Sequence, residues 1–266
     1  MLTLKRAVSL LLALTLSPRI LGSGGNEKDM YSSSFHFSFS PAIYQGLSIK
    51  HRGVGQYLKS YPLPSGECSI GYGLHIENGY FINADLGFGV IPVSAGFNFS
   101  GPVTPAGFEE ENNHTMLCFD YIQLITTYTI SFQKLVISRK SEDYTHSFET
   151  GVKLNRLLIY PLSYEIGYNY FNEFQEIPFF SFQLDNDVSK NFISFFAKVG
   201  RKKKLKNGNF MQVSLVGNFS PKTIGKGSYR FENLQHESYG DVYQTINYVG
   251  VEFKLNFKPS KILNYI

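Results

Sequence analysis

Alternating apolar and polar residues recur along this chain and predict β-strands. The clearest case is CSIGYGLHIENGYFINADLGFGV, from Cys68 to Val90, where every second side chain is large and apolar. The residues between them are mostly glycine or small polar residues. A repeat of two is typical of strands, and Asn78-Gly79 favours a tight turn, so this stretch predicts a β-hairpin.

The register of this hairpin follows from keeping its two faces distinct. A three-residue loop, Glu77-Asn78-Gly79, pairs Leu74 with Ile82 and Tyr72 with Ala84, so that one face is wholly apolar. The opposite face then holds the pairs His75/Phe81, Gly73/Asn83, Gly71/Asp85 and Ser69/Gly87. We expect Gly79 to adopt the left-handed conformation that such a loop requires.

Similar strand signals cover most of the chain. They occur at 33–40, 93–100, 116–132, 157–171, 191–200, 209–220 and 245–257. No later stretch is apolar over the ~18 residues that a membrane-spanning helix needs. The fold class is therefore all-β, and we predict a closed, antiparallel, up-and-down barrel of eight to twelve strands, with ten as the preferred number.

The apolar face could point into a protein core or out into lipid. A soluble secreted β-barrel or sandwich that binds a ligand would turn it inward. A transmembrane barrel would turn it outward and keep a polar interior. The density of Phe, Tyr, Leu and Ile on one face, and of Gly, Ser, Asn and Asp on the other, favours the transmembrane barrel.

The first residues are typical of an export signal. Lys5 and Arg6 precede a short apolar stretch, AVSLLLALTL, and small residues follow Pro18. We expect residues 1–23 to be a signal peptide and residues 24–266 to form one outer-membrane β-barrel domain.

Charge and cysteine content exclude some functions. The net charge is +4, and removing Lys5, Arg6 and Arg19 with residues 1–23 leaves 4 − 3 = +1, which does not support nucleic-acid binding. Cys68 and Cys118 are the two cysteines, and they could form one disulfide or remain two apolar thiols. The sequence predicts neither a metal site nor a cofactor.

Two segments resemble a known group of proteins. FDYIQLITTYTISF, from Phe119 to Phe132, and NYVGVEFKLNF, from Asn247 to Phe257, are similar to strands of outer-membrane β-barrel proteins of the Bacteroidetes porin-like or PorT-like type. The resemblance implies outer-membrane lipid and the barrel-assembly machinery as partners. The sequence departs from that type at Thr126 and Thr127, and in a tail that continues past Phe257.

Three sets of residues are candidates for a functional site. His236 and Ser238, with Glu252, resemble the catalytic residues of lipid A deacylases, although an ordinary polar loop explains HESYG more simply. We expect a polar cluster inside the barrel and a basic hairpin loop. The cluster would contain Asp85, Glu165, Glu252 and Lys254, and the loop would contain Arg201, Lys202, Lys203, Lys204 and Lys206.

These patterns predict a protein of the cell outer membrane whose interior is polar and mostly filled. Its role would be structural, or would be binding through exposed loops to an unknown ligand. The alternatives are a narrow solute channel, a lipid A-modifying barrel enzyme and the soluble binding protein.

Overall fold

The structure is a computed structural model. It describes residues 33–98, 115–137, 144–158, 163–172, 175–185, 190–205, 208–232 and 237–257. The expected signal peptide, the loop at 99–114 and the tail after Phe257 lie outside these residues. Within these ranges there is no helix with the length and apolar character needed to span a membrane.

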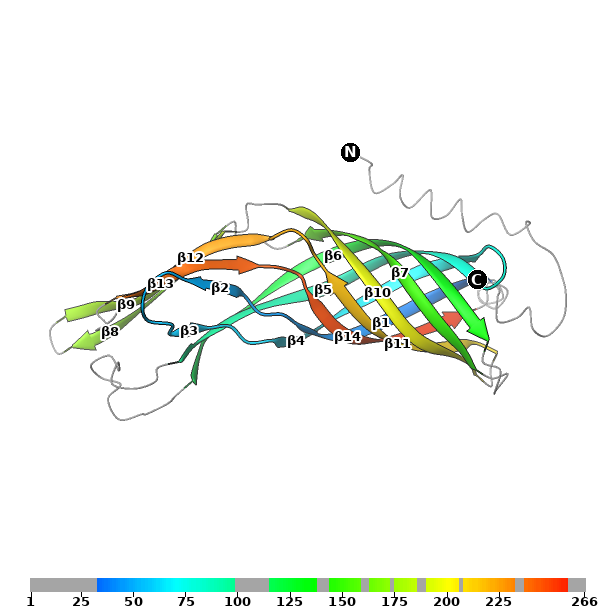
Figure 1. Ribbon diagram of the computed structural model, residues 1–266, viewed down its shortest axis with the longest axis horizontal. Coiled ribbons are helices and arrows are strands. Elements are labelled where there is room, and N and C mark those ends of the chain that lie inside the picture. The colour runs from blue at the N-terminus through cyan, green and yellow to red at the C-terminus, as the bar shows by residue number, and fades with distance from the viewer. Residues whose placement is uncertain are drawn as a thin grey trace.

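In the described part of the chain, eight antiparallel strands close a barrel (Figure 1). They are β1 (Ser34–Tyr44), β4 (Leu63–His75), β5 (Tyr80–Asn98), β6 (Thr115–Ile137), β7 (Tyr144–Leu157), β10 (Asn191–Lys204), β11 (Phe210–Phe219) and β14 (Tyr248–Phe257). Neighbours in the barrel follow the order of these strands along the chain, and β1 pairs with β14 to close the wall. This confirms the predicted up-and-down barrel.

The Cys68–Val90 hairpin has the predicted register. Leu74 lies opposite Ile82, and Tyr72 opposite Ala84. At the turn the Tyr80 amide donates to the Glu77 carbonyl at 2.8 Å. Gly79 has a positive φ of 76°, as expected, and Asn78 has one of 49°.

Five further strands form a second sheet at one end of the barrel, which we call the capping sheet (Figure 1). They are β2 (Ser48–His51), β8 (Ser163–Asn172), β9 (Gln175–Asp185), β12 (Gly225–Phe231) and β13 (Ser238–Gln244). The short strand β3 (Leu58–Lys59) pairs with the far end of β5. Ten barrel strands was therefore too many, because several strand signals belong to the capping sheet.

We call the end of the barrel that carries this sheet the capped end, and the opposite end the terminal mouth. β1 begins and β14 ends at the terminal mouth, where Phe35 lies opposite Phe257.

The outside of the barrel is apolar. Exposed apolar side chains occur on all eight strands and include Phe37, Phe39, Leu74, Leu86, Phe88, Ile130, Phe132, Phe148, Leu154, Phe195, Val199, Val213, Leu215, Val249 and Phe253. Leu74, Leu86 and Phe253 are 41%, 37% and 41% exposed, so the apolar face points outward, as the transmembrane interpretation requires.

The inward face changes its chemistry along the barrel axis. On β5 the inward residues run from Phe81, Asn83 and Asp85 through two glycines to Ile91 and Val93. Near the capped end the inward residues are therefore apolar. There β5 and β6 extend beyond their pairings with β4 and β7, and β5 packs against the capping sheet.

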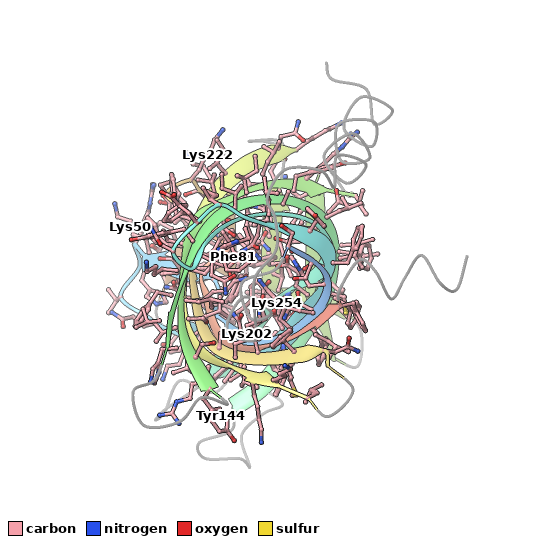
Figure 2. All side chains as sticks on the ribbon, turned by 90° about the vertical axis from the view of Figure 1, so that its right-hand side faces the viewer. Lys50, Phe81, Tyr144, Lys202, Lys222 and Lys254 are labelled. Carbon is pink, nitrogen blue, oxygen red and sulfur yellow. The ribbon has the colours of Figure 1, made fainter. Side chains whose placement is uncertain are left out.

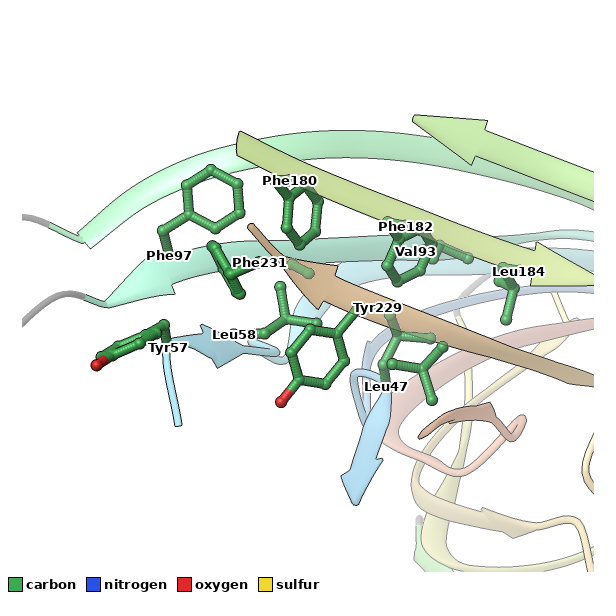
Figure 3. Packing of buried hydrophobic residues seen from close by; sticks show 12 residues of the cluster. Leu47, Tyr57, Leu58, Val93, Phe97, Phe180, Phe182, Leu184, Tyr229 and Phe231 are labelled. Carbon is green, nitrogen blue, oxygen red and sulfur yellow. The ribbon is translucent and has the colours of Figure 1, made fainter. Parts of the chain in front are cut away.

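An apolar cluster fills the space under the capping sheet. It is built mainly from aromatic residues of the sheet and of β5, together with residues before and in β3 (Figure 3): Leu47, Tyr57, Leu58, Val93, Ala95, Phe97, Phe180, Phe182, Leu184, Tyr229, Phe231 and Val242. Ring contacts join the two sides, since Phe97 lies 4.7 Å from Phe180 and 5.1 Å from Phe231 between ring centroids. The cap thus has a core like that of a water-soluble protein.

Candidate functional site in the barrel interior

Four charged side chains from three strands meet in the middle of the barrel. Glu149 on β7 accepts hydrogen bonds from Lys254 at 3.1 Å and Lys198 at 3.5 Å. Lys198 on β10 also donates to Glu252 at 2.7 Å. Burial of isolated charges is costly, so this reciprocal pairing is what allows four of them to share the interior.

A second pair lies nearer the capped end. Lys153 donates to Glu67 at 2.6 Å and to the Tyr248 hydroxyl at 2.9 Å. Thr127 donates to the other oxygen of Glu67 at 2.9 Å. Four strands, β4, β6, β7 and β14, are thereby connected across the interior.

Further polar side chains lie between the charged layers and the terminal mouth. His36 contacts Asp85, and both are buried. A chain of side-chain amides crosses the interior, from Asn83 to Gln133 at 3.3 Å and from Gln133 to Gln212 at 2.9 Å. These contacts connect β5 and β6 with β11 across the interior.

Glycine on the inward face makes room for the charged groups. A side chain on Gly87 would place its Cβ 2.9 Å from Glu67 Oε1 and closer still to Thr127. A side chain on Gly71 would overlap both Asp85 and the carbonyl of Ala84. Glycine therefore occurs at these inward positions because a larger residue would occupy the space of the neighbouring charged side chains.

Above the Glu67–Lys153 pair, an apolar layer closes the interior. It contains Ala42, Tyr44, Ile91, Ile125, Leu157, Phe192, Val216, Ile224, Ile246 and Tyr248. Tyr44 and Tyr248 stack with their ring centroids 4.7 Å apart. Beyond this layer one buried amide pair, Gln244 to Gln123 at 3.0 Å, precedes the core of the cap.

Of the residues expected to form the polar cluster, three lie together and one does not. Asp85, Glu252 and Lys254 are buried in the barrel interior. Glu165 lies on β8, opposite Gln183, and so belongs to the capping sheet instead. Its strand has the same alternation as a barrel strand, which is why the pattern misplaced it.

Sequence reasoning missed most of the interior charges, namely Glu67, Glu149, Lys153, Lys198 and Lys202. Each lies on the inward parity of its strand, so a signal was present. In SFETGVKL, for example, Glu149 and Lys153 alternate with the exposed Phe148, Val152 and Leu154.

The expected basic loop is largely strand. β10 continues to Lys204, so Arg201, Lys202, Lys203 and Lys204 alternate between the two faces of the wall, and Lys202 is buried inside. The predicted hairpin is present, since the Leu205 amide donates to the Asn209 carbonyl at 2.8 Å. Lys206 lies outside the described residues.

The structure does not bring the deacylase-like residues together. Ser238 is buried at the start of β13 in the cap, whereas Glu252 bonds to Lys198 in mid-barrel. β13 and β14 run in the same direction along the molecule (Figure 1), so at ~3.3 Å per residue the two lie roughly 30 Å or more apart. His236 lies outside the described residues.

Of the two cysteines, Cys68 is a free thiol on the exposed side of β4 and lies opposite Phe88. Cys118 belongs to β6, in the extension near the register shift at Ala95 and Gly96. The side chain of Cys118 lies outside the described part of the structure, so the free thiol is established for Cys68 alone.

No protein-family model matches the chain, and no curated protein matches it. Among solved structures, it is similar to the outer membrane protein OprG from Pseudomonas aeruginosa, with 10% identity and a TM-score of 0.43 over 84% of this chain and 96% of that chain. A major outer membrane protein from Thermus thermophilus matches with 11% identity and a TM-score of 0.40 over 84% and 99%. The outer membrane protease OmpT from Escherichia coli matches with 8% identity and a TM-score of 0.35 over 84% and 97%. At 8–11% identity and TM-scores below 0.5, these similarities carry no information on function.

Proposed function

We propose that this protein is an integral outer-membrane β-barrel with a closed interior, which presents the capping sheet to the outside of the cell. The observation that carries the proposal is the reversal of polarity: the barrel is apolar outside and ionic inside, whereas the cap is apolar inside and polar outside. A wall of this kind is stable in lipid, and a cap of this kind is stable in water.

The height of the barrel supports insertion in a membrane. β14 crosses with alternate outward residues Val249, Val251, Phe253, Leu255 and Phe257. This span of nine residues lies within the ~9–11 residues that a tilted transmembrane strand needs. At the terminal mouth the outward residues become basic and aromatic.

That rim has the composition of a membrane interface. The Lys134 ammonium lies 3.5 Å from the centre of the Tyr80 ring, and that of Lys203 lies 5.0 Å from the Tyr144 ring. Aromatic rings and cations of this kind favour the level of lipid headgroups. Outer-membrane lipid is thus the proposed partner of the barrel surface.

Connection lengths support an orientation. Those at the terminal mouth are short, at 76–79, 138–143 and 205–209, whereas those at the capped end span 45–62, 99–114, 158–190 and 220–247. Outer-membrane barrels place short turns in the periplasm and long loops outside. The cap would then be the exposed, binding or structural part, and the barrel-assembly machinery would insert the chain after its export by residues 1–23.

Fractionation tests the membrane assignment. We expect the protein in the outer-membrane pellet, released only by detergent, with a gel mobility that changes on heating. Recovery in the supernatant without detergent would contradict the proposal and favour the soluble binding protein.

Cysteine labelling tests the orientation. In a variant lacking Cys68 and Cys118, a cysteine at Lys226 in the cap should react with an impermeant maleimide in whole cells. A cysteine at Lys203 should react only after the outer membrane is broken. The reverse pattern would contradict the proposed orientation.

A narrow solute channel is the second candidate, because the ionic layers provide polar surface along part of the axis. The apolar layer around Tyr44, Phe192 and Ile246 argues against it. In planar bilayers we expect no steady single-channel conductance, and a stable ohmic conductance would establish the channel instead.

A further inference from the structure

Lys202 is a buried lysine that has no acidic partner among the described residues. It lies on the inward face of β10 near the terminal mouth, and it is 3% exposed (Figure 2). Within the described residues, its ammonium group takes part in no ion pair and no hydrogen bond. Its ammonium group does lie over the faces of two aromatic rings, those of Phe81 and Phe210.

The other three interior lysines are all paired. Lys153 bonds to Glu67, and both Lys198 and Lys254 bond to Glu149. The ammonium groups of these three lysines lie 2.6–3.5 Å from carboxylate oxygens, and Lys202 differs from them in having no such contact among the described residues. Since leaving a buried cation unpaired is costly, an occupant of opposite charge is the natural complement of Lys202.

Two aromatic rings flank this ammonium group. The rings of Phe210 and Phe81 lie 5.0 Å and 5.4 Å from it and restrict access by water. Register places Lys202 beside Gln212, and Gln212 beside Lys254, in one row across β10, β11 and β14. Figure 2 looks into the terminal mouth and shows Lys202 and Lys254 inside the ring of strands, with Phe81 beside them.

Near the mouth, the Asn256 side chain accepts a hydrogen bond from Ser34 at 3.5 Å but uses only its oxygen among the described residues. The side-chain nitrogen of Asn256, on the inward face of β14, is buried and donates to no described residue. Asn256 lies opposite both Phe210 and His36, so it belongs to the same end of the interior. Lys202 and Asn256 both offer donors and no negative charge, which selects an acceptor.

We propose that the terminal mouth binds a small oxyanion, with phosphate or carboxylate chemistry, through Lys202 and with a supporting bond from Asn256. Charge-assisted hydrogen bonds in a site shielded by aromatic rings are strong enough to hold such an ion. Glu149 and Glu252 already pair with Lys198 and Lys254, so these two lysines are engaged and Lys202 is left as the residue to bind an anion.

Inorganic phosphate titrated into the full-length protein in a neutral detergent, at constant ionic strength, tests the proposal. Calorimetry should show saturable binding, and phosphate should raise the thermal unfolding midpoint, because a ligand that binds only the folded state stabilises it. Lys202→Met should weaken binding roughly tenfold or more, and Asn256→Leu should weaken it by a smaller factor.

Two further variants keep the test decisive. Lys203→Met removes a cation from the next position of the same strand but on the outer face, and it should bind phosphate as the unchanged protein does. Lys202→Arg keeps the charge and should retain binding, so it distinguishes loss of the site from loss of the fold.

Parallel titrations with acetate and with a short-chain phospholipid identify the source of the anion. We expect the free ions to bind and the lipid not to, since Lys202 and the acyl chains lie on opposite sides of the wall. No saturable phosphate binding, equal binding by Lys202→Met, or binding of the lipid alone would overturn the proposal. None of these results bears on membrane insertion, which the fractionation tests separately.

Discussion

At the scale of single residues, what decides the barrel interior is whether each buried charge has a partner. Glu149 is the most heavily used acceptor, since it receives bonds from Lys198, Lys254 and Ser131. The alternation of each strand was enough to place Asp85 and Lys254 on the inward parity. It could not reveal which charges meet, because Glu149 and Lys254 come together from positions more than a hundred residues apart.

Glu149→Ala should therefore destabilise the barrel strongly. Lys198 and Lys254 would be left to share Glu252, and breaking a buried ionic group of this kind costs ~3–5 kcal/mol. The measurement is denaturant unfolding of the refolded protein in detergent. Glu77→Ala, in an exposed turn, is the control and should change little; an equal effect of both would show that the interior network contributes nothing special.

A charge added to an exposed position should be tolerated on the capping sheet. It should not be tolerated on the apolar outer surface in the middle of the barrel. Ile130 is 68% exposed on β6 in mid-barrel, where Ile130→Arg would place a cation against acyl chains at a cost of ~2–4 kcal/mol. Ser181→Arg, on the exposed side of β9, should have almost no effect. The folding yield of each variant in lipid vesicles measures both effects, and similar yields would contradict the proposed lipid-facing surface of the barrel.

At the scale of elements, the β4–β5 hairpin could be predicted in detail and the capping sheet could not. The hairpin is local, and the turn residues Asn78 and Gly79 determine its register. The cap contains two local pairings, β8 with β9 and β12 with β13, but its sheet also needs β13 to pair with β2 and β12 with β9, which are widely separated in sequence. Because strands of the cap and of the barrel share a period of two, alternation does not distinguish a strand that faces lipid from one that faces water.

His51 gives the cap a dependence on pH. Its ring nitrogen lies 2.5 Å from the Tyr229 hydroxyl, and burial lowers the pKa of His51 below its usual value of 6.5. A histidine with a depressed pKa is protonated more readily in the unfolded chain, so the cap should lose stability as the pH falls below ~6.5. Hydrogen exchange of the β2 and β13 amides between neutral and mildly acidic pH measures this loss.

His51→Phe is the matched variant, since it keeps an aromatic ring against Tyr229 without a titrating group. Its β2 and β13 amides should exchange with much less dependence on pH in this range. If both proteins lose protection equally on acidification, another group is responsible.

At the scale of the whole molecule, the barrel and the capping sheet are two bodies with separate apolar cores. β5 connects them, because it is a barrel strand whose far end packs against the sheet. The apolar layer around Ile91 and Ile125 and the core around Phe97 and Phe231 are separate clusters. The membrane-type exterior could be inferred from composition and parity alone. The division into two bodies could not, because it depends on where β5 and β6 leave the barrel wall.

The two bodies should respond separately to damage in the cap. A side chain at Gly227 would overlap the Gln183 carbonyl and break the pairing of β12 with β9, so Gly227→Val should make the cap sensitive to protease. The barrel should keep its heat-modifiable mobility. Gly217→Ala is the control, since nothing lies within 4 Å of a Cβ there; loss of barrel mobility in Gly227→Val alone would show that the cap supports the wall.

The order of the strands has a consequence for biogenesis. The cap collects its strands from three separate excursions of the chain, between β1 and β4, between β7 and β10, and between β11 and β14. The last of these excursions directly precedes β14, so the crown of the molecule is complete only after all but one of the strands of the cylinder have been synthesised. A conformational antibody against that crown would accordingly count finished molecules and pass over those still being inserted.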